Sequence, residues 1–256
     1  MYGLAGISVT SDGAVRVVTL DRPDELNAFS GELHDSFVQL WSRVRDDTDA
    51  RAVVLTGAGR AFSAGGSYAD FERRRVDLDF RQHEMDHARD IVMGMVDCPL
   101  PVVAAVNGPA VGLGCTVATL CDIVFIAEGA FLADPHVSVA LVAGDGSAVT
   151  WPAHTSLLKA KQYVLTGDRI PAVEAVAMGL ANFVVPKDEL LDGALAFAHR
   201  LAAQPPQAVR ESKRILNEVL RRNAERALQS GLDAEYASHD TPEYAASAEA
   251  MKPKPS

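Results

Sequence analysis

Three short apolar runs, each followed by a loop rich in small residues or by a helical pattern, constrain the fold of this chain most strongly. The runs are Ala52 to Thr56, Pro101 to Val106 and Ile123 to Ala127. A continuous apolar run of this length is typical of a strand that is covered on both faces, as in a parallel sheet. Strands that alternate with helices therefore predict an α/β fold with a parallel sheet.

The flanking segments extend this prediction. Residues Ile7 to Leu20 alternate around Ser11-Asp12-Gly13, which predicts a hairpin at the edge of the sheet. Apolar residues recur at helical spacing from Leu33 to Val44, behind a Ser30 cap, which predicts an amphipathic helix.

The last third of the chain is expected to be mostly helical. It contains one more apolar strand at Asn182 to Val185 and two long helical patterns near residues 188–204 and 206–231. A thin layer of helices cannot bury all of their apolar positions, so we expect them to pack against another subunit. The expected organisation is a core over residues 1–195 and a C-terminal helical oligomerisation region over residues 196–256.

Composition excludes several classes of protein. The chain has 256 residues, 48% hydrophobic and 23% charged, and a net charge of −10, which disfavours nucleic acid or an anionic membrane as a partner. The stretch from Cys98 to Cys121 is uncharged but interrupted by prolines and glycines, so it does not predict a membrane span. The cysteines form no CxxC pattern, and the first ten residues do not resemble a secretion signal. We therefore expect a cytoplasmic protein.

Two small-residue loops are the first candidates for a functional site. Ala61-Phe-Ser-Ala-Gly-Gly-Ser67 and Asn107-Gly-Pro-Ala-Val-Gly-Leu-Gly114 each follow a predicted strand. Ligands of open α/β sheets collect at the carboxyl ends of strands, and small residues let a substrate approach the main chain. Together the loops could present two N–H groups to a carbonyl oxygen that becomes negative during reaction, as an oxyanion hole does.

The ordered motifs resemble those of the crotonase (enoyl-CoA hydratase/isomerase) superfamily over nearly the whole chain. The matching segments are Asp21-Arg-Pro-Asp-Glu-Leu-Asn-Ala28, Val53-Val-Leu-Thr-Gly57, Arg60-Ala-Phe-Ser-Ala-Gly65, Pro101-Val-Val-Ala-Ala-Val-Asn-Gly108, Cys121-Asp122 and Leu165-Thr-Gly-Asp-Arg-Ile170. The resemblance implies a spiral of ββα turns and a homotrimer or dimer of trimers joined through the C-terminal helices. It also implies an acyl-CoA substrate, with coenzyme A as part of that substrate and no prosthetic group.

The resemblance assigns positions for substrate contacts. The thioester oxygen would be held by the N–H groups of Gly66 and Leu113. Further substrate-binding positions, some of them along the pantetheine and adenine, are Leu26, Ala28, Ala64, Ser67, Tyr68, Gly112, Thr116 and Pro135. The chain lacks an early lysine, so Arg22 or the run Arg73-Arg74-Arg75 is a candidate to hold the phosphates.

The departures from the family pattern bear on the reaction. Hydratases of this family use two glutamates to add water, and Thr116 and His136 stand at those positions. A threonine hydroxyl is no carboxylate base at neutral pH, so hydration by the paired-carboxylate route should be severely impaired. His136 and Asp145 instead predict a dyad in which the carboxylate orients an imidazole that moves a proton or activates water.

The series Asp134-Pro135-His136, Gly144-Asp145-Gly146 and Trp151-Pro152 is similar to the 6-oxocamphor hydrolase branch of the superfamily, which cleaves β-diketones. That similarity adds Glu235 as a third catalytic candidate. The sequence departs from this branch at Leu113, where the branch has an enolate-binding histidine.

Three functional hypotheses follow. The first is an enzyme that acts on an acyl-CoA thioester through the oxyanion hole and the His/Asp dyad. The second is a coenzyme-A-independent retro-Claisen hydrolase of cyclic β-diketones, and the third is a non-catalytic acyl-CoA binder. His83 and His87 have the spacing of a metal-binding pair, but the sequence shows no third ligand and we expect no metal site. Met85, His87 and Met95 are candidates for contact with the acyl group.

Overall fold

The computed structural model describes residues 2–67 and 70–251 and confirms the mixed α/β prediction. The strands are β1 Ile7–Asp12, β2 Val15–Leu20, β3 Ala52–Gly57, β4 Val102–Val106, β5 Ala110–Val111, β6 Ile123–Ala127, β7 Phe131–Ala133, β8 Ile170–Pro171 and β9 Phe183–Val185. The helices are α1 Gly31–Asp46, α2 Phe71–Val76, α3 Leu78–Val96, α4 Leu113–Leu120, α5 Ser147–His154, α6 Leu157–Thr166, α7 Ala172–Met178, α8 Leu190–Ala202, α9 Pro206–Leu216, α10 Glu218–Ser238 and α11 Pro242–Ala250, with 3₁₀ turns η1 Pro23–Glu25 and η3 His136–Val139.

The main sheet has the strand order β1-β2-β3-β4-β6-β9. The predicted hairpin β1-β2 is antiparallel, and every later pair is parallel. All side chains of β4 are buried, which explains why this strand reads as a continuous apolar run. A smaller sheet of order β5-β7-β8 lies beside the main one and carries the loop that contains His136.

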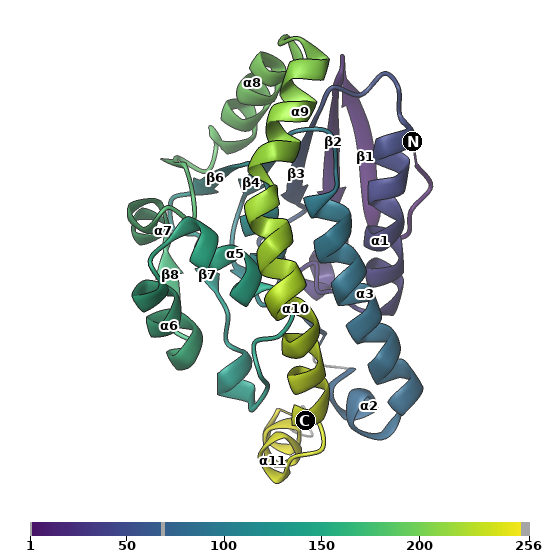
Figure 1. Cartoon of the computed structure of the whole chain (residues 1–256), viewed down its shortest axis with the longest axis vertical. Helices are drawn as coiled ribbons and strands as arrows, with labels where there is room; N and C mark the ends of the chain where they lie inside the picture. The colour runs from purple at the N-terminus through teal and green to yellow at the C-terminus, as the bar shows by residue number, and fades with distance from the viewer. Residues whose placement is uncertain (1, 68–69, 252–256) are drawn as a thin grey trace.

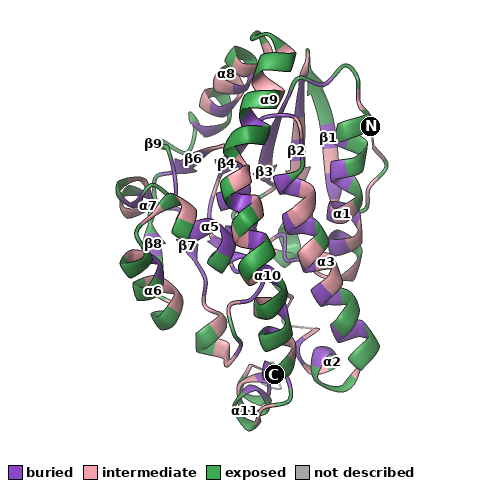
Figure 2. Ribbon diagram, in the orientation of Figure 1, coloured by how far each residue is buried: buried purple, intermediate pink, exposed green. Residues whose placement is uncertain are grey.

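Helices α1 and α3 lie side by side, and α10 runs along α3 and α5 (Figure 1). The buried residues of α10 recur every three or four positions, at Leu220, Ala224, Leu228, Leu232, Glu235 and Ser238, whereas much of the side of α10 that Figure 2 shows is exposed. The predicted helix over residues 206–231 is in fact two helices, α9 and α10, that meet at Asn217. The side-chain amide of Asn217 donates to the carbonyl of Val96 at 2.9 Å, which anchors the junction to the end of α3.

The C-terminal helices are part of the same body as the sheet. Helix α8 packs on β3, β4 and β6 and runs through residue 195, the expected domain boundary. No helix in residues 2–67 and 70–251 is long and apolar enough to cross a membrane.

Candidate active site

The two glycine-containing loops contact each other at the carboxyl ends of β3 and β4. A Cβ on Gly65 would lie 2.5 Å from the carbonyl oxygen of Val111, and the φ of Gly65 is +81°, so only glycine fits there. The N–H of Val111 donates to the carbonyl of Ser63 at 3.0 Å, which bonds one loop to the other. The close approach fixes the main chain of both loops.

Gly66 and Leu113 line one pocket. Leu113 is the first residue of α4, where an N–H has no acceptor within the helix. Within the described part of the chain, neither N–H group donates a hydrogen bond. Two fixed donors beside a cavity can stabilise a carbonyl oxygen that gains negative charge.

The imidazole of His136 lies beside the second loop. Its Cε1 atom would be 3.5 Å from a Cβ built on Gly112, the residue before Leu113. Nδ1 of His136 donates a hydrogen bond to Oδ1 of Asp134, a buried carboxylate two residues earlier. Because Nδ1 is bonded to Asp134, Nε2 is the ring nitrogen that is left for proton transfer.

Two more carboxylates approach Nε2 of His136. Asp145 Oδ2 lies 3.5 Å from Nε2, and Glu235 Oε1 lies 3.8 Å from it. Glu235 comes from α10 and reaches the pocket because Gly144 packs closely on Gly231, where a Cβ on Gly144 would meet the Gly231 carbonyl at 2.3 Å. The C-terminal helices therefore complete the pocket.

The ionisable groups around His136 shift one another's pKa values. Burial by itself would lower the pKa of His136, but the carboxylates of Asp134, Asp145 and Glu235 raise it well above its usual value. Burial raises the pKa of Glu235 to about 8, and the charge of Asp145 adds to the effect. Burial and the charge of Asp134 also raise the pKa of Asp145. The directions of these shifts favour the protonated carboxyl of Glu235 and the imidazolium form of His136, which is paired with Asp134.

We expect Glu235→Gln to make the protein progressively more stable than the wild type as pH rises from 6 to 9. A carboxyl whose pKa is raised from 4.5 to about 8 on folding binds its proton more tightly in the folded state. Its contribution to stability is therefore present below its unfolded pKa and is lost as pH rises through about 8. Thermal unfolding at several pH values measures the difference. The exposed Glu225→Gln on the same helix is the control, and an equal pH profile for both variants would contradict the raised pKa.

A second polar network forms another wall of the pocket. His34 Nδ1 donates to Glu84 Oε1 at 3.0 Å, and Arg74 donates to Glu84 Oε2 at 2.8 Å; all three residues are buried. Burial opposes ionisation of Glu84, but His34 and Arg74 overcome it and lower its pKa to about 2. The guanidinium of Arg74 lies 3.5 Å from the Cβ position of Gly66, so a cationic group borders one of the proposed oxyanion donors.

Comparison with known proteins identifies the family. A family model described as enoyl-CoA hydratase/isomerase matches residues 10–253. The chain belongs to the enoyl-CoA hydratase/isomerase family. It is 30% identical over 226 residues to the short-chain-enoyl-CoA hydratase of Clostridium acetobutylicum, covering 88% of this chain and 86% of that protein. It is also 30% identical over 232 residues to the 2,3-dehydroadipyl-CoA hydratase of Escherichia coli, covering 91% and 88%.

Solved structures agree with this assignment. An enoyl-CoA hydratase/isomerase from Mycobacterium paratuberculosis is 49% identical and superposes with a TM-score of 0.94, over 98% of this chain and 100% of that one. The crotonase fold expected from the motifs is thus confirmed. The protein is an enzyme of the crotonase lyase/isomerase class.

The fold of the present enzyme brings most of the predicted site residues together. The pocket is lined by eight of them: Ala64, Gly66, Gly112, Leu113, Pro135, His136, Asp145 and Glu235. Leu26, Ala28, Ser67 and Thr116 are not among the lining residues, although the carbonyl of Leu26 accepts a hydrogen bond from the N–H of Ala64. Tyr68 lies outside the described residues.

Several residues with a predicted role make contacts other than the expected ones. Thr116 is buried behind Asp145, to which its hydroxyl donates at 3.3 Å. The arginines considered for phosphates are each paired with a carboxylate of the same chain: Arg22 with Glu25, Arg73 with Asp77, Arg74 with Glu84 and Arg75 with Glu72. Met85 lines the pocket, whereas Met95 is in the core. His87 faces Asp35 instead.

Sequence reasoning missed three polar residues that line the pocket, and the role of Asp134 behind it. Asp134 was visible beside His136, but its side chain could not be assigned to Nδ1 without the turn of η3. His34 comes from α1, Glu84 from α3 and His239 from the end of α10, and they match no local motif. Only the fold brings them together.

Proposed function

We propose that this enzyme acts on an acyl-CoA thioester whose carbonyl oxygen is held by the N–H groups of Gly66 and Leu113. His136, held by Asp134, exchanges a proton with the substrate through Nε2. The observation that carries this proposal is the position of the His136 ring against Gly112, in the same pocket as the two N–H groups that lack acceptors within the described residues.

The pocket supplies what proton transfer next to a thioester requires. As the bond between the α-carbon and hydrogen breaks or forms, negative charge collects on the carbonyl oxygen, where the two N–H groups stabilise it. To remove the α-proton, the imidazolium of His136 first passes its Nε2 proton to the carboxylate of Asp145, 3.5 Å away. The neutral ring then takes the α-proton, and the imidazolium so formed returns a proton to the enolate. Glu235 Oε1 lies 3.8 Å from Nε2 and borders the same proton path. The sequence had suggested only a base oriented by Asp145.

The relatives support the same substrate class. The Clostridium and Escherichia proteins are named as hydratases of enoyl-CoA and 2,3-dehydroadipyl-CoA. For the present enzyme we place coenzyme A as part of the substrate, along Leu26, Ala28 and Ala64. The pocket holds about 100 Å³, less than the roughly 150 Å³ cavity that accommodates benzene, so a short acyl group fits it best.

Assembly into a homotrimer or dimer of trimers is a separate part of the proposal. Ile215, Leu216 and Val219 are exposed at the α9–α10 junction. Leu216 and Val219 border an apolar hollow formed with the end of α4 and with α8. Packing of this face on a second copy would bury it.

A retro-Claisen hydrolase of cyclic β-diketones remains the second candidate. The three carboxylates around His136, together with threonine at the first hydratase position, are the observation that favours it. In that reaction His136 would activate water for attack on one carbonyl, and no coenzyme A would be needed.

Calorimetric titration with acetoacetyl-CoA tests the substrate class before the reaction. We expect saturable binding in roughly the micromolar range, and weaker binding of free coenzyme A because it lacks the acyl carbonyl that the N–H groups hold. Absence of binding at about millimolar ligand would contradict the thioester proposal. Turnover of a cyclic 1,3-diketone by the same preparation would then support the hydrolase.

A further inference from the structure

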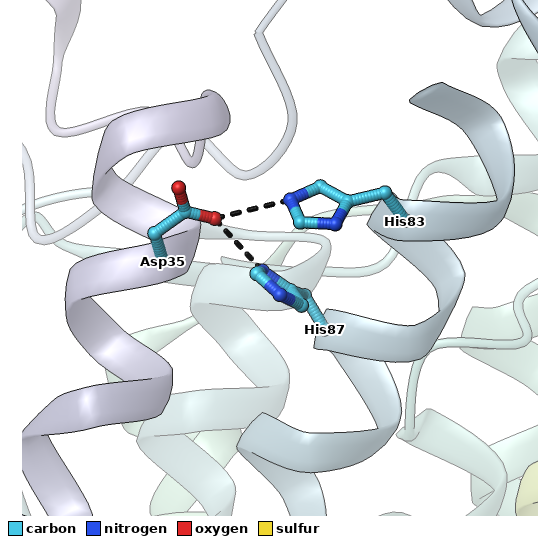
Figure 3. A group of neighbouring side chains, drawn as sticks. All are labelled: Asp35, His83 and His87. Atoms are coloured by element: carbon cyan, nitrogen blue, oxygen red, sulfur yellow. Dashed lines mark hydrogen bonds and ion pairs between the residues drawn. The ribbon is translucent and has the colours of Figure 1, made fainter. Parts of the chain in front are cut away.

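A cluster of three potential metal ligands lies outside the active site. His83 and His87 from α3 face Asp35 from α1, and both rings point at the same carboxylate oxygen (Figure 3). Nε2 of His83 and Nδ1 of His87 each lie 3.1 Å from Oδ1 of Asp35. One candidate ligand atom from each of the three residues can be chosen so that all lie within 4.8 Å of one another.

The two histidines belong to a known metal-binding pattern. Residues 83–87 read His-Glu-Met-Asp-His, which places two imidazoles on one face of a helix, as in zinc sites with the H-E-x-x-H spacing. The sequence showed no third ligand, and the fold supplies Asp35. Glu84 would be the catalytic base in a metallopeptidase, but here it is buried and bound to His34 and Arg74. The pattern thus provides metal ligands without a hydrolytic base.

The distances suit a shared ion. Zinc binds imidazole nitrogen and carboxylate oxygen at about 2.0–2.2 Å, so ligand atoms around one ion are separated by roughly 3.0–3.5 Å for angles between 90° and tetrahedral. The two distances of 3.1 Å to Asp35 lie in that range.

His87 also offers a ligand atom that is not used elsewhere. Its Nδ1 is buried and has no hydrogen-bond partner among the described residues, although it lies at ion-pair distance from Asp35.

We propose that Asp35, His83 and His87 bind a divalent transition-metal ion of the zinc class, which ties α1 to α3. Two imidazoles and one carboxylate select such an ion over magnesium or calcium, which prefer oxygen ligands. Asp35 and His83 are about half exposed, so water can complete the coordination shell. Their chain neighbours His34 and Glu84 line the active-site pocket, so the ion would brace the wall that carries them.

Titration of chelator-treated, dialysed full-length protein with ZnCl₂ tests this proposal, with calorimetry as the readout. We expect about one ion per chain with a Kd in the micromolar range or tighter. His83→Ala and His87→Ala should each weaken binding at least about tenfold, because each removes one of three ligands. The absorption spectrum of bound Co²⁺ should report nitrogen and oxygen ligands, and should be lost in the same variants.

Two matched variants locate the ion. His136→Ala removes a ligand from the other candidate group, Asp134, His136 and Asp145, and should leave zinc binding unchanged. His199→Ala removes an exposed histidine that faces the single carboxylate of Asp12 at 2.9 Å, and should also leave it unchanged. Zinc should raise the unfolding temperature of the wild type and of both controls, but not that of His87→Ala.

Two results would overturn the proposal. One is no binding up to about 1 mM Zn²⁺. The other is binding that survives His83→Ala and His87→Ala but is lost in His136→Ala, which would place the ion in the active site.

Discussion

Replacement of His136 by alanine is expected to lower turnover of acyl-CoA thioesters by at least about 100-fold. The substitution removes the ring whose Nε2 faces Asp145 and Glu235, and general acid–base groups typically contribute 10²- to 10⁴-fold to a rate. Activity is measured with a panel of enoyl-CoA and β,γ-unsaturated acyl-CoA thioesters. Binding of acetoacetyl-CoA should change much less, because the main-chain donors remain.

Two carboxylate variants sharpen this prediction. Asp134 accepts the hydrogen bond from Nδ1, whereas Asp145 lies 3.5 Å from Nε2. We therefore expect Asp134→Asn to disturb the orientation and charge of His136 more than Asp145→Asn does, with the larger loss of kcat. His199→Ala serves as the histidine control. Wild-type turnover in His136→Ala would remove this histidine from the mechanism.

Replacement of Gly66 by proline should cost about 100-fold or more in kcat/KM. Proline has no N–H, so one of the two donors to the thioester oxygen disappears. Loss of one oxyanion-hole donor typically costs 10²- to 10³-fold. Steady-state kinetics on the same thioester panel measures the loss.

Gly66→Ala is the matched control for that variant. A Cβ at this position would lie 3.5 Å from the nearest atom, on Arg74, which is an ordinary contact, and the N–H is retained. Alanine should keep most of the activity. If the proline variant folds and is as active as the alanine variant, Gly66 is not an oxyanion donor.

The main elements of the fold could be predicted because each leaves a local pattern. Burial of both faces makes β3 and β4 continuously apolar, and the one-sided burial of α1 gives helical spacing from Leu33 to Val44. The break at Asn217 left no such pattern, because the sequence has neither proline nor glycine at this position. The junction is instead marked by a tertiary contact, the hydrogen bond from Asn217 to Val96. Helix ends set by tertiary contacts are not visible in a single sequence.

Part of the candidate site could be predicted from the sequence in the same way. The glycine loops and His136 lie in motifs with fixed spacing, so the sequence alone indicates them as site residues. The partner of His136 Nδ1 depends on how the chain turns after β7. Asp134 makes the hydrogen bond that orients the ring, the role that the sequence had assigned to Asp145. Asp35 and His83 are 48 residues apart, and only the packing of α1 on α3 joins them.

We expect this enzyme to stabilise an acyl-CoA enolate while His136 moves the proton. The rate of deuterium incorporation from D₂O at the α-carbon of a β,γ-unsaturated acyl-CoA, followed by mass spectrometry, measures this step. Incorporation should depend on the enzyme and should fall at least about 100-fold in His136→Gln while binding is kept. Tight binding of the thioester without incorporation by the wild type would contradict this expectation and indicate a non-catalytic acyl-CoA binder.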